Sequence, residues 1–121
     1  MVNWNIARLN GDPQAIEEVF VAMADDDVPG FATAPAMLIL QEVTNSARVS
    51  ILNILEDAIP GVDYQTATFT IGSSENGSGG AQMLIYRSDV FEEIAAGHRD
   101  ISTGAGRNTD RWQLRSLGST D

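Results

Sequence analysis

Glu42 is the side chain in this sequence whose type and position best suit chemistry. It stands at the end of residues 36–40, an unbroken apolar run behind Pro35. A short apolar run of this kind is typical of a strand that is buried on both faces. In an open sheet covered by helices, ligands bind outside the carboxyl ends of such strands, which makes Glu42 a candidate ligand-binding residue. The alternative is that Glu42 only begins the next helix, where a carboxylate suits the helix dipole.

Two amides occupy a second segment with strand character. Val2, Trp4 and Ile6 alternate with Asn3 and Asn5, which predicts a half-buried strand with the apolar side chains on one face. Asn is a poor strand residue, so two of them in one short strand need a reason. An amide at a strand end can bind a phosphate oxygen or orient a metal-bound carboxylate. The alternative is a strand that frays into solvent at its start.

The element between these strands is predicted to be a helix. Asp12 is a typical cap and Pro13 suits the first helical position. The apolar residues that follow have helical spacing: Ile16, Val19, Phe20 and Met23. The acidic residues 25–27 lack the alternating oxygens, the Gly and the distal Glu of a calcium loop, so they are expected to form a solvated loop.

A second helix is predicted after Glu42. Asn45 or Ser46 can cap it, and residues 60–61, Pro and Gly, end it. Its expected apolar stripe is Val49, Leu52, Leu55 and Ile59, joined by Ile51 and Ile54. The order strand, helix, strand, helix favours an α/β sheet with a parallel pair of strands.

The pattern changes in the second half of the chain. Residues 64–71 are rich in β-formers, and residues 81–86 form another apolar run. They are expected to pair as an antiparallel hairpin with a long tip at 72–80, whose glycines lack phosphate-loop spacing. A short edge strand is expected at 90–94 and a last strand at 111–115.

Composition limits the classes of protein that fit. A chain of 121 residues with 43% apolar and 20% charged residues fits one globular domain and is too apolar for disorder. No apolar run approaches the roughly 18 residues of a membrane span, and no signal peptide is evident. The absence of Cys excludes disulfides, thiolate metal sites and Cys nucleophiles, and it leaves the localisation open.

The charge is unusually negative. All seven cationic residues are Arg, and 17 acidic residues bring the net charge to −10. Such a surface repels nucleic-acid phosphates, so a broad polyanion-binding surface is not expected. Four of the seven Arg follow residue 98, which places the positive field toward the C-terminal part. His98 itself lies in a polar loop and is expected to face the solvent.

Three short motifs together resemble the endonuclease/exonuclease/phosphatase superfamily, the fold of pancreatic deoxyribonuclease. They are Trp-Asn-Ile at residues 4–6, Leu-Gln-Glu-Val at 40–43, and Gln-Met-Leu-Ile-Tyr-Arg-Ser-Asp at 82–89. Each motif is short, but their order and spacing across nearly the whole chain make the resemblance fairly specific.

The resemblance implies roles for individual residues. Asn5 would be the active-site Asn, and Glu42 would bind the divalent metal, usually Mg²⁺, with Mn²⁺ or Ca²⁺ as alternatives. Arg111 would match a family Arg that precedes a sheet strand and would contact substrate. Asn3 departs from the Ser, Thr or small residue that is usual at its place.

The resemblance also implies a particular architecture. The family fold is a four-layer α/β sandwich of two sheets with helices outside. The second half of that fold carries a Gly-Asp-x-Asn pattern, a further catalytic His or Tyr region and a Ser-Asp-His, and none of them occurs in this sequence. Residues 1–121 are therefore expected to form the N-terminal half, a mixed sheet with helices on one face, and to be inactive alone.

An incomplete sandwich has a consequence for the surface. The strands around Leu38, Leu40, Leu84 and Tyr86 are apolar on both sides, whereas two helices can cover only one side. The other face is expected to leave a few hundred Å² of apolar surface in water, which monomers rarely tolerate. The expected partner is the missing C-terminal half or a second copy of the chain that packs on this face.

The chemistry that fits these residues is metal-dependent hydrolysis of a phosphate ester. This reaction needs a metal, a base that prepares water and donors to the transition state. Glu42 can supply one oxygen ligand, and Mg²⁺ keeps several waters, so few carboxylates can suffice. No general base is evident, because His98 is not at the family's position. The alternative function is a non-catalytic α/β interaction module or an inactive fragment.

Overall fold

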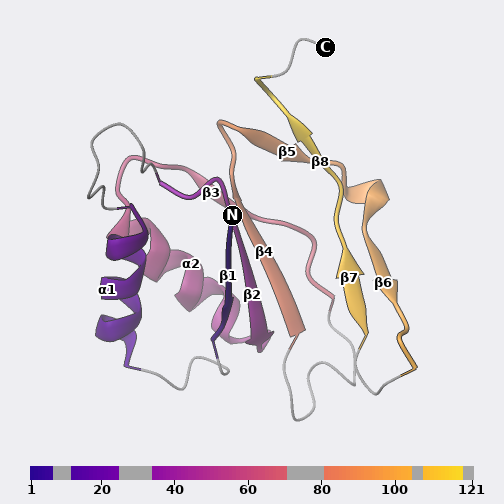
Figure 1. Cartoon of the computed structure of the whole chain (residues 1–121), viewed down its shortest axis with the longest axis horizontal. Coiled ribbons are helices and arrows are strands. Elements are labelled where there is room, and N and C mark those ends of the chain that lie inside the picture. Colours follow the sequence, from indigo (N-terminus) through magenta and orange to yellow (C-terminus); the bar gives the residue numbers. More distant parts are fainter. Residues whose placement is uncertain (7–11, 25–33, 71–80, 105–107, 119–121) are drawn as a thin grey trace.

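A mixed sheet of four strands, in the order β1-β2-β4-β3, organises the structure (Figure 1). The strands are β1 (Val2–Asn5), β2 (Met37–Val43), β3 (Tyr64–Thr66) and β4 (Ala81–Arg87). β1 runs parallel to β2, whereas β4 is antiparallel to both β2 and β3. The predicted parallel pair and the predicted hairpin are therefore both confirmed.

The structure is a computed structural model that describes residues 1–6, 12–24, 34–70, 81–104 and 108–118. The expected solvated loop at 25–27 and the hairpin tip at 72–80 lie outside the described residues. Among the helices that are described, none is long and apolar enough to cross a membrane.

Two helices cover one face of the sheet, as expected (Figure 1). They are α1 (Pro13–Ala24) and α2 (Ala47–Ala58). The predicted cap of α1 is confirmed, because the Asp12 carboxylate accepts a hydrogen bond from the backbone N–H of Gln14 at 3.0 Å. Ser46 stands at the cap position of α2, but its side chain does not bond to the helix.

The main core lies between these helices and the sheet. Trp4 meets Phe20 edge-on, with ring centroids 5.8 Å apart. Alternate residues of the strands join α1 and α2 in this core, which includes Ile6, Ile16, Phe20, Leu38, Leu40, Ile51, Leu55, Met83 and Ile85. The expected stripe of α2 is wrong at Val49, which is 70% exposed. Leu55, Ile59 and Ile51 are buried as expected, and Ala47, which was not expected, joins Ile51 and Leu55 at a spacing of four residues.

The C-terminal segments cover part of the other sheet face. They comprise β5 (Phe91–Glu93) paired with β8 (Leu114–Ser116), β6 (Arg99–Ile101) paired with β7 (Thr109–Arg111), and the short 3₁₀ helix η3 (Ala95–Gly97). Phe91, Trp112 and Leu114 pack against Leu84 and Tyr86 in a second, smaller core.

The expectation of an exposed apolar sheet face is corrected by this second core. Leu38 and Leu40 are fully buried, and Leu84 and Tyr86 are only 4% and 9% exposed. Helices are not the only elements that cover the sheet, because Trp112 also packs on it and its ring N–H donates to the Thr68 carbonyl at 2.7 Å. The mixed α/β fold is as expected, and the four-layer sandwich stays a prediction.

Two strands differ in length from the expected ones. β3 ends at Thr66 instead of running to residue 71. Beyond Thr66, the Ala67 N–H still donates to the Leu84 carbonyl at 2.9 Å, and the Thr68 N–H bonds to the Glu93 carboxylate at 2.9 Å and 3.1 Å. The expected last strand at 111–115 is divided between β7 and β8.

Candidate functional site

The predicted strand ends meet at one edge of the sheet. The register of β1 and β2 pairs Asn5 with Gln41, and the N–H of Ile6 donates to the Gln41 carbonyl at 3.0 Å. Asn5 therefore lies beside the residue that precedes Glu42. Because Trp4 packs toward the helices, Asn5 faces the opposite side of the sheet. The juxtaposition of the two strand ends that carry Asn5 and Glu42 is thus present.

Glu42 lies in a β-bulge rather than at a helix start. Leu40 pairs with Met83 and Val43 pairs with Ala81, so two residues of β2 stand against Gln82 alone. Glu42 adopts φ 58°, in the left-handed region that costs a residue with a side chain roughly 1–2 kcal/mol. α2 begins only at Ala47. The alternative in which Glu42 begins that helix is therefore wrong.

The second amide of β1 has a structural partner. Gln41 donates from its side-chain Nε2 to the Oδ1 of Asn3 at 3.1 Å. This bond links β1 and β2 on the exposed face and explains an Asn within a strand. β1 is also paired from Val2 onward, so it does not fray at its start.

Gln82 connects this edge to the C-terminal hairpin. Its Oε1 accepts the backbone N–H of Asp110 at 2.9 Å and the hydroxyl of Thr109 at 3.5 Å. Because Gln82 is also the residue opposite the bulge, it joins the strand that carries Glu42 to β7. The sequence does not reveal this connection, because Gln82 lies within an apolar run that predicts only a strand.

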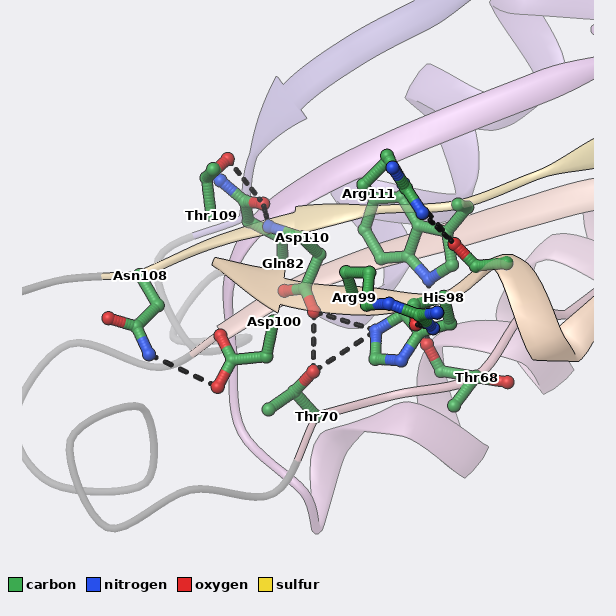
Figure 2. A network of polar contacts seen from close by, with 12 residues as sticks. Thr68, Thr70, Gln82, His98, Arg99, Asp100, Asn108, Thr109, Asp110 and Arg111 are labelled. Carbon is green, nitrogen blue, oxygen red and sulfur yellow. Dashed lines mark hydrogen bonds and ion pairs between the residues drawn. The ribbon is translucent and has the colours of Figure 1, made fainter. Parts of the chain in front are cut away.

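A network of His98, Asp110 and Thr70 lies on the far side of Gln82 (Figure 2). The His98 Nε2 is 2.9 Å from the Asp110 Oδ1 and 3.2 Å from the Thr70 hydroxyl, which also bonds to Asp110. The side chains of His98 and Asp110 are only 14% and 3% exposed. The expectation that His98 faces the solvent is therefore wrong.

The pairing of β6 with β7 produces this network. Asp100 pairs with Asp110 in the register, which brings His98, the residue before β6, close to Asp110 despite a separation of 12 residues. The sequence predicts a strand at 111–115, and that pattern does not reveal which residues Asp110 meets. Asp110 and Thr70 were not predicted.

The backbone around His98 is held closely. A Cβ on Gly97 would lie 2.6 Å from the Cβ of Gln113, so only Gly fits this approach. The Arg111 guanidinium donates to the Gly97 carbonyl from Nε at 3.3 Å and from Nη2 at 3.2 Å. Arg99 donates to the carbonyl of His98 itself at 2.7 Å. Arg111, the predicted substrate-binding residue, thus lies beside the network.

The donor set decides which metal could fit. Among the described residues, no three His, Asp or Glu side chains are grouped to hold a metal ion. The register brings the carboxylate of Glu42 and the side-chain amides of Asn5 and Gln41 near the bulge, whereas the Gln82 oxygen already accepts hydrogen bonds from Thr109 and Asp110. Hard oxygen donors of this kind suit Mg²⁺, which takes one or two carboxylates and keeps its waters, and they do not suit Zn²⁺.

A hollow elsewhere on the surface is unsuited to phosphate. It has a volume of about 480 Å³ and lies along α1, with Glu17 and Glu18 in its lining. Two carboxylates there would repel a phosphate group.

Comparison with protein-family models, with curated proteins and with solved structures finds no match to this chain. The resemblance to the endonuclease/exonuclease/phosphatase superfamily therefore rests on residues 4–6, 40–43 and 82–89 and stays a prediction.

Proposed function

We propose that this chain forms the metal-binding edge of a phosphoesterase. The single observation that carries the proposal is the β-bulge at Glu42. The backbone of this residue is left-handed, and it lies beside the strand end that carries Asn5. Bulges of this kind re-aim side chains next to active sites, and backbone strain of this kind concentrates where a ligand is held. A carboxylate that served only to solubilise the surface would not need such a conformation.

Each residue has a distinct part in the proposed site. Glu42 binds the cation, and Asn5 hydrogen-bonds a phosphate oxygen or orients the Glu42 carboxylate. When bound, Mg²⁺ supplies charge neutralisation at the phosphate. Arg111, whose guanidinium also bonds to Gly97, is available for the substrate's phosphate group.

The charge favours a small substrate. A net charge of −10 opposes the approach of a long polyanion, whereas a single phosphate ester can be held by local donors. Further ligands and donors would come from a second polypeptide segment, so the chain alone is expected to leave phosphodiesters uncleaved. In the alternative function, an interaction module, Glu42 would bind no cation.

Manganese can test the proposal in solution. Substoichiometric Mn²⁺ broadens backbone amide NMR signals close to its binding site, even when binding is weak. We expect broadening at residues 5 and 41–43, loss of this effect in Glu42→Gln, and retention in Glu56→Gln, a matched change at an exposed residue of α2. Broadening that is unchanged in Glu42→Gln would contradict the proposal and favour the interaction module.

A further inference from the structure

The hollow along α1 is a groove between the two helices, which lie side by side on one face of the sheet (Figure 1). This helix groove has a volume of about 480 Å³ and is lined by Pro13, Gln14, Glu17, Glu18, Val21 and Ile54. Five of these residues belong to α1, and from first to last they span about 12 Å at about 1.5 Å per residue. The helix groove is therefore elongated, and its volume has room for several side chains.

Part of the helix groove is apolar surface that the core does not cover. Val21 of α1 is 47% exposed, and Ile54 of α2 is half-buried. Val is a poor residue for an exposed position within a helix, because its branched side chain loses rotamer freedom there. A partner's apolar side chain that packs on Val21 and Ile54 would remove this surface from water.

Carboxylates border the apolar part. Glu17 and Glu18 stand four and three residues before Val21, so both are its neighbours on the surface of α1. Asp57 stands three residues after Ile54 on α2 and is its neighbour in the same way. Within the described part of the chain, no ion pair joins any of these three carboxylates to a cation.

The helices supply little positive charge of their own. Their sequences contain four carboxylates and one cation, Arg48. That guanidinium is held elsewhere, over the Phe69 ring at 4.5 Å and against the Asn45 Oδ1 at 2.5 Å. A cationic ligand would therefore meet uncompensated carboxylates at the helix groove, and the net charge of −10 would attract it from a distance.

We propose that the helix groove binds a basic amphipathic helix of a partner protein. Apolar side chains at i, i+3, i+4 and i+7 extend over about 10 Å of such a helix, which matches the length of the groove. Its Lys or Arg side chains lay their alkyl stems on Val21 and place their charges at Glu17 and Glu18. The groove lies on the helix side of the sheet, whereas Asn5 faces the other side, so the inference is independent of the phosphoesterase proposal.

A synthetic peptide tests the chemistry of the partner. The probe has about 18 residues, enough to form a helix, with Leu at i, i+3, i+4 and i+7 and Lys and Ala elsewhere. It should shift the backbone amide NMR signals of residues 13–21 and 54, and added NaCl should weaken its binding. A peptide of the same composition with Leu spread around the helix should bind at least about threefold more weakly. A peptide with Glu in place of Lys should give no shifts.

Matched variants locate the binding surface. Glu18→Lys and Glu56→Lys change the charge equally, but of the two residues only Glu18 lines the helix groove. Val21→Gln and Val49→Gln each remove an exposed Val from a helix, and of these only Val21 lines the groove. We expect Glu18→Lys and Val21→Gln to weaken binding of the basic peptide by about 3- to 10-fold, and the two controls by less than about twofold. All four side chains are exposed, so the variants should fold, which urea unfolding verifies.

Each outcome decides for or against the helix groove. Equal weakening by Glu18→Lys and Glu56→Lys would reduce the binding to attraction by the net charge and overturn the proposal. Shifts outside residues 13–21 and 54, or equal binding of the two Lys peptides, would also overturn it. The same shifts on concentrating the chain alone would assign the groove to a second copy.

The metal edge is tested separately. Broadening by Mn²⁺ at residues 5 and 41–43 should be unchanged in Val21→Gln, so failure of the helix groove and failure of the phosphoesterase proposal are distinguishable. Should a variant fail to fold, the comparison of the three peptides on the unaltered chain still decides whether the groove binds a basic amphipathic helix.

Discussion

The left-handed backbone at Glu42 makes a quantitative prediction about stability. At φ 58° a side chain costs roughly 1–2 kcal/mol, which Gly does not incur. Gly in a strand loses about 0.5–1 kcal/mol relative to Ala through its greater freedom in the unfolded chain. Glu42→Gly should therefore be more stable than Glu42→Ala by about 0.5–1 kcal/mol, the difference between these central values.

Comparing the two variants isolates the backbone effect. Both lack the carboxylate and every contact that it makes, so the difference in their free energies of unfolding reports the conformation alone. Urea unfolding followed by Trp fluorescence measures this difference. For a chain of this size, about 0.5–1 kcal/mol corresponds to about 2–4 °C in melting temperature.

Metal binding completes the experiment. Neither variant should bind Mn²⁺, so the Gly variant should gain stability relative to Ala without recovering the site. That combination is expected where strain is kept for function. A Gly variant that is equal to or less stable than the Ala variant would refute the reasoning, because the bulge would then impose no strain on Glu42.

Three further predictions concern the rest of the fold. Gly61 follows α2 at φ 84° with nothing within 4 Å of an added Cβ, so Gly61→Ala should lose about 1 kcal/mol in urea unfolding through backbone strain alone. Tyr64 donates from its hydroxyl to the buried Pro35 carbonyl at 2.8 Å, and Tyr64→Phe should cost about 1–3 kcal/mol. Burial raises the pKa of Tyr64 above its ordinary value of 10.0. The stability that the neutral hydroxyl contributes is therefore complete below pH 10.0 and is lost as pH rises through the raised pKa. In urea unfolding at alkaline pH, the difference in free energy of unfolding between the unaltered chain and Tyr64→Phe should shrink. Trp112→Ala should lower the free energy of unfolding by about 2 kcal/mol, because the half-buried ring covers the second sheet face. The variant should also bind more of a hydrophobic dye. An unchanged dye signal would show that other groups cover this face.

Periodicity predicted the elements that make the main core. The alternation at residues 2–6 and the apolar run at 36–40 predicted β1 and β2 in their correct relation, and the Asp-Pro start at residue 12 predicted α1. These patterns succeed because burial on one face imposes a repeat that the sequence records directly. The error at Val49 shows the limit: a helix with many apolar residues offers more than one stripe, and contacts with its neighbours decide which is buried.

The local geometry of the site could not be predicted in the same way. A bulge arises from a mismatch in register between β2 and β4, and nothing in residues 40–43 alone records which residue of β4 they oppose. The network around His98 depends on the pairing of β6 with β7 and on a hydrogen bond from Gln82. Such long-range polar contacts have no sequence period, so a loop His and a buried one look alike.

The strain at Glu42 and the burial of Asp110 both cost folding free energy, and both restrict side chains of the candidate site. A left-handed Glu costs folding free energy, which the paired strands on both sides of β2 must offset. A carboxylate that is 3% exposed also costs desolvation, and its bonds to His98 and Thr70 offset this cost only while that geometry is kept. Both features fix side chains on one sheet face more firmly than packing would require. A surface that served only to cover the core could use Gly at the bulge, where a residue without a Cβ incurs no such strain.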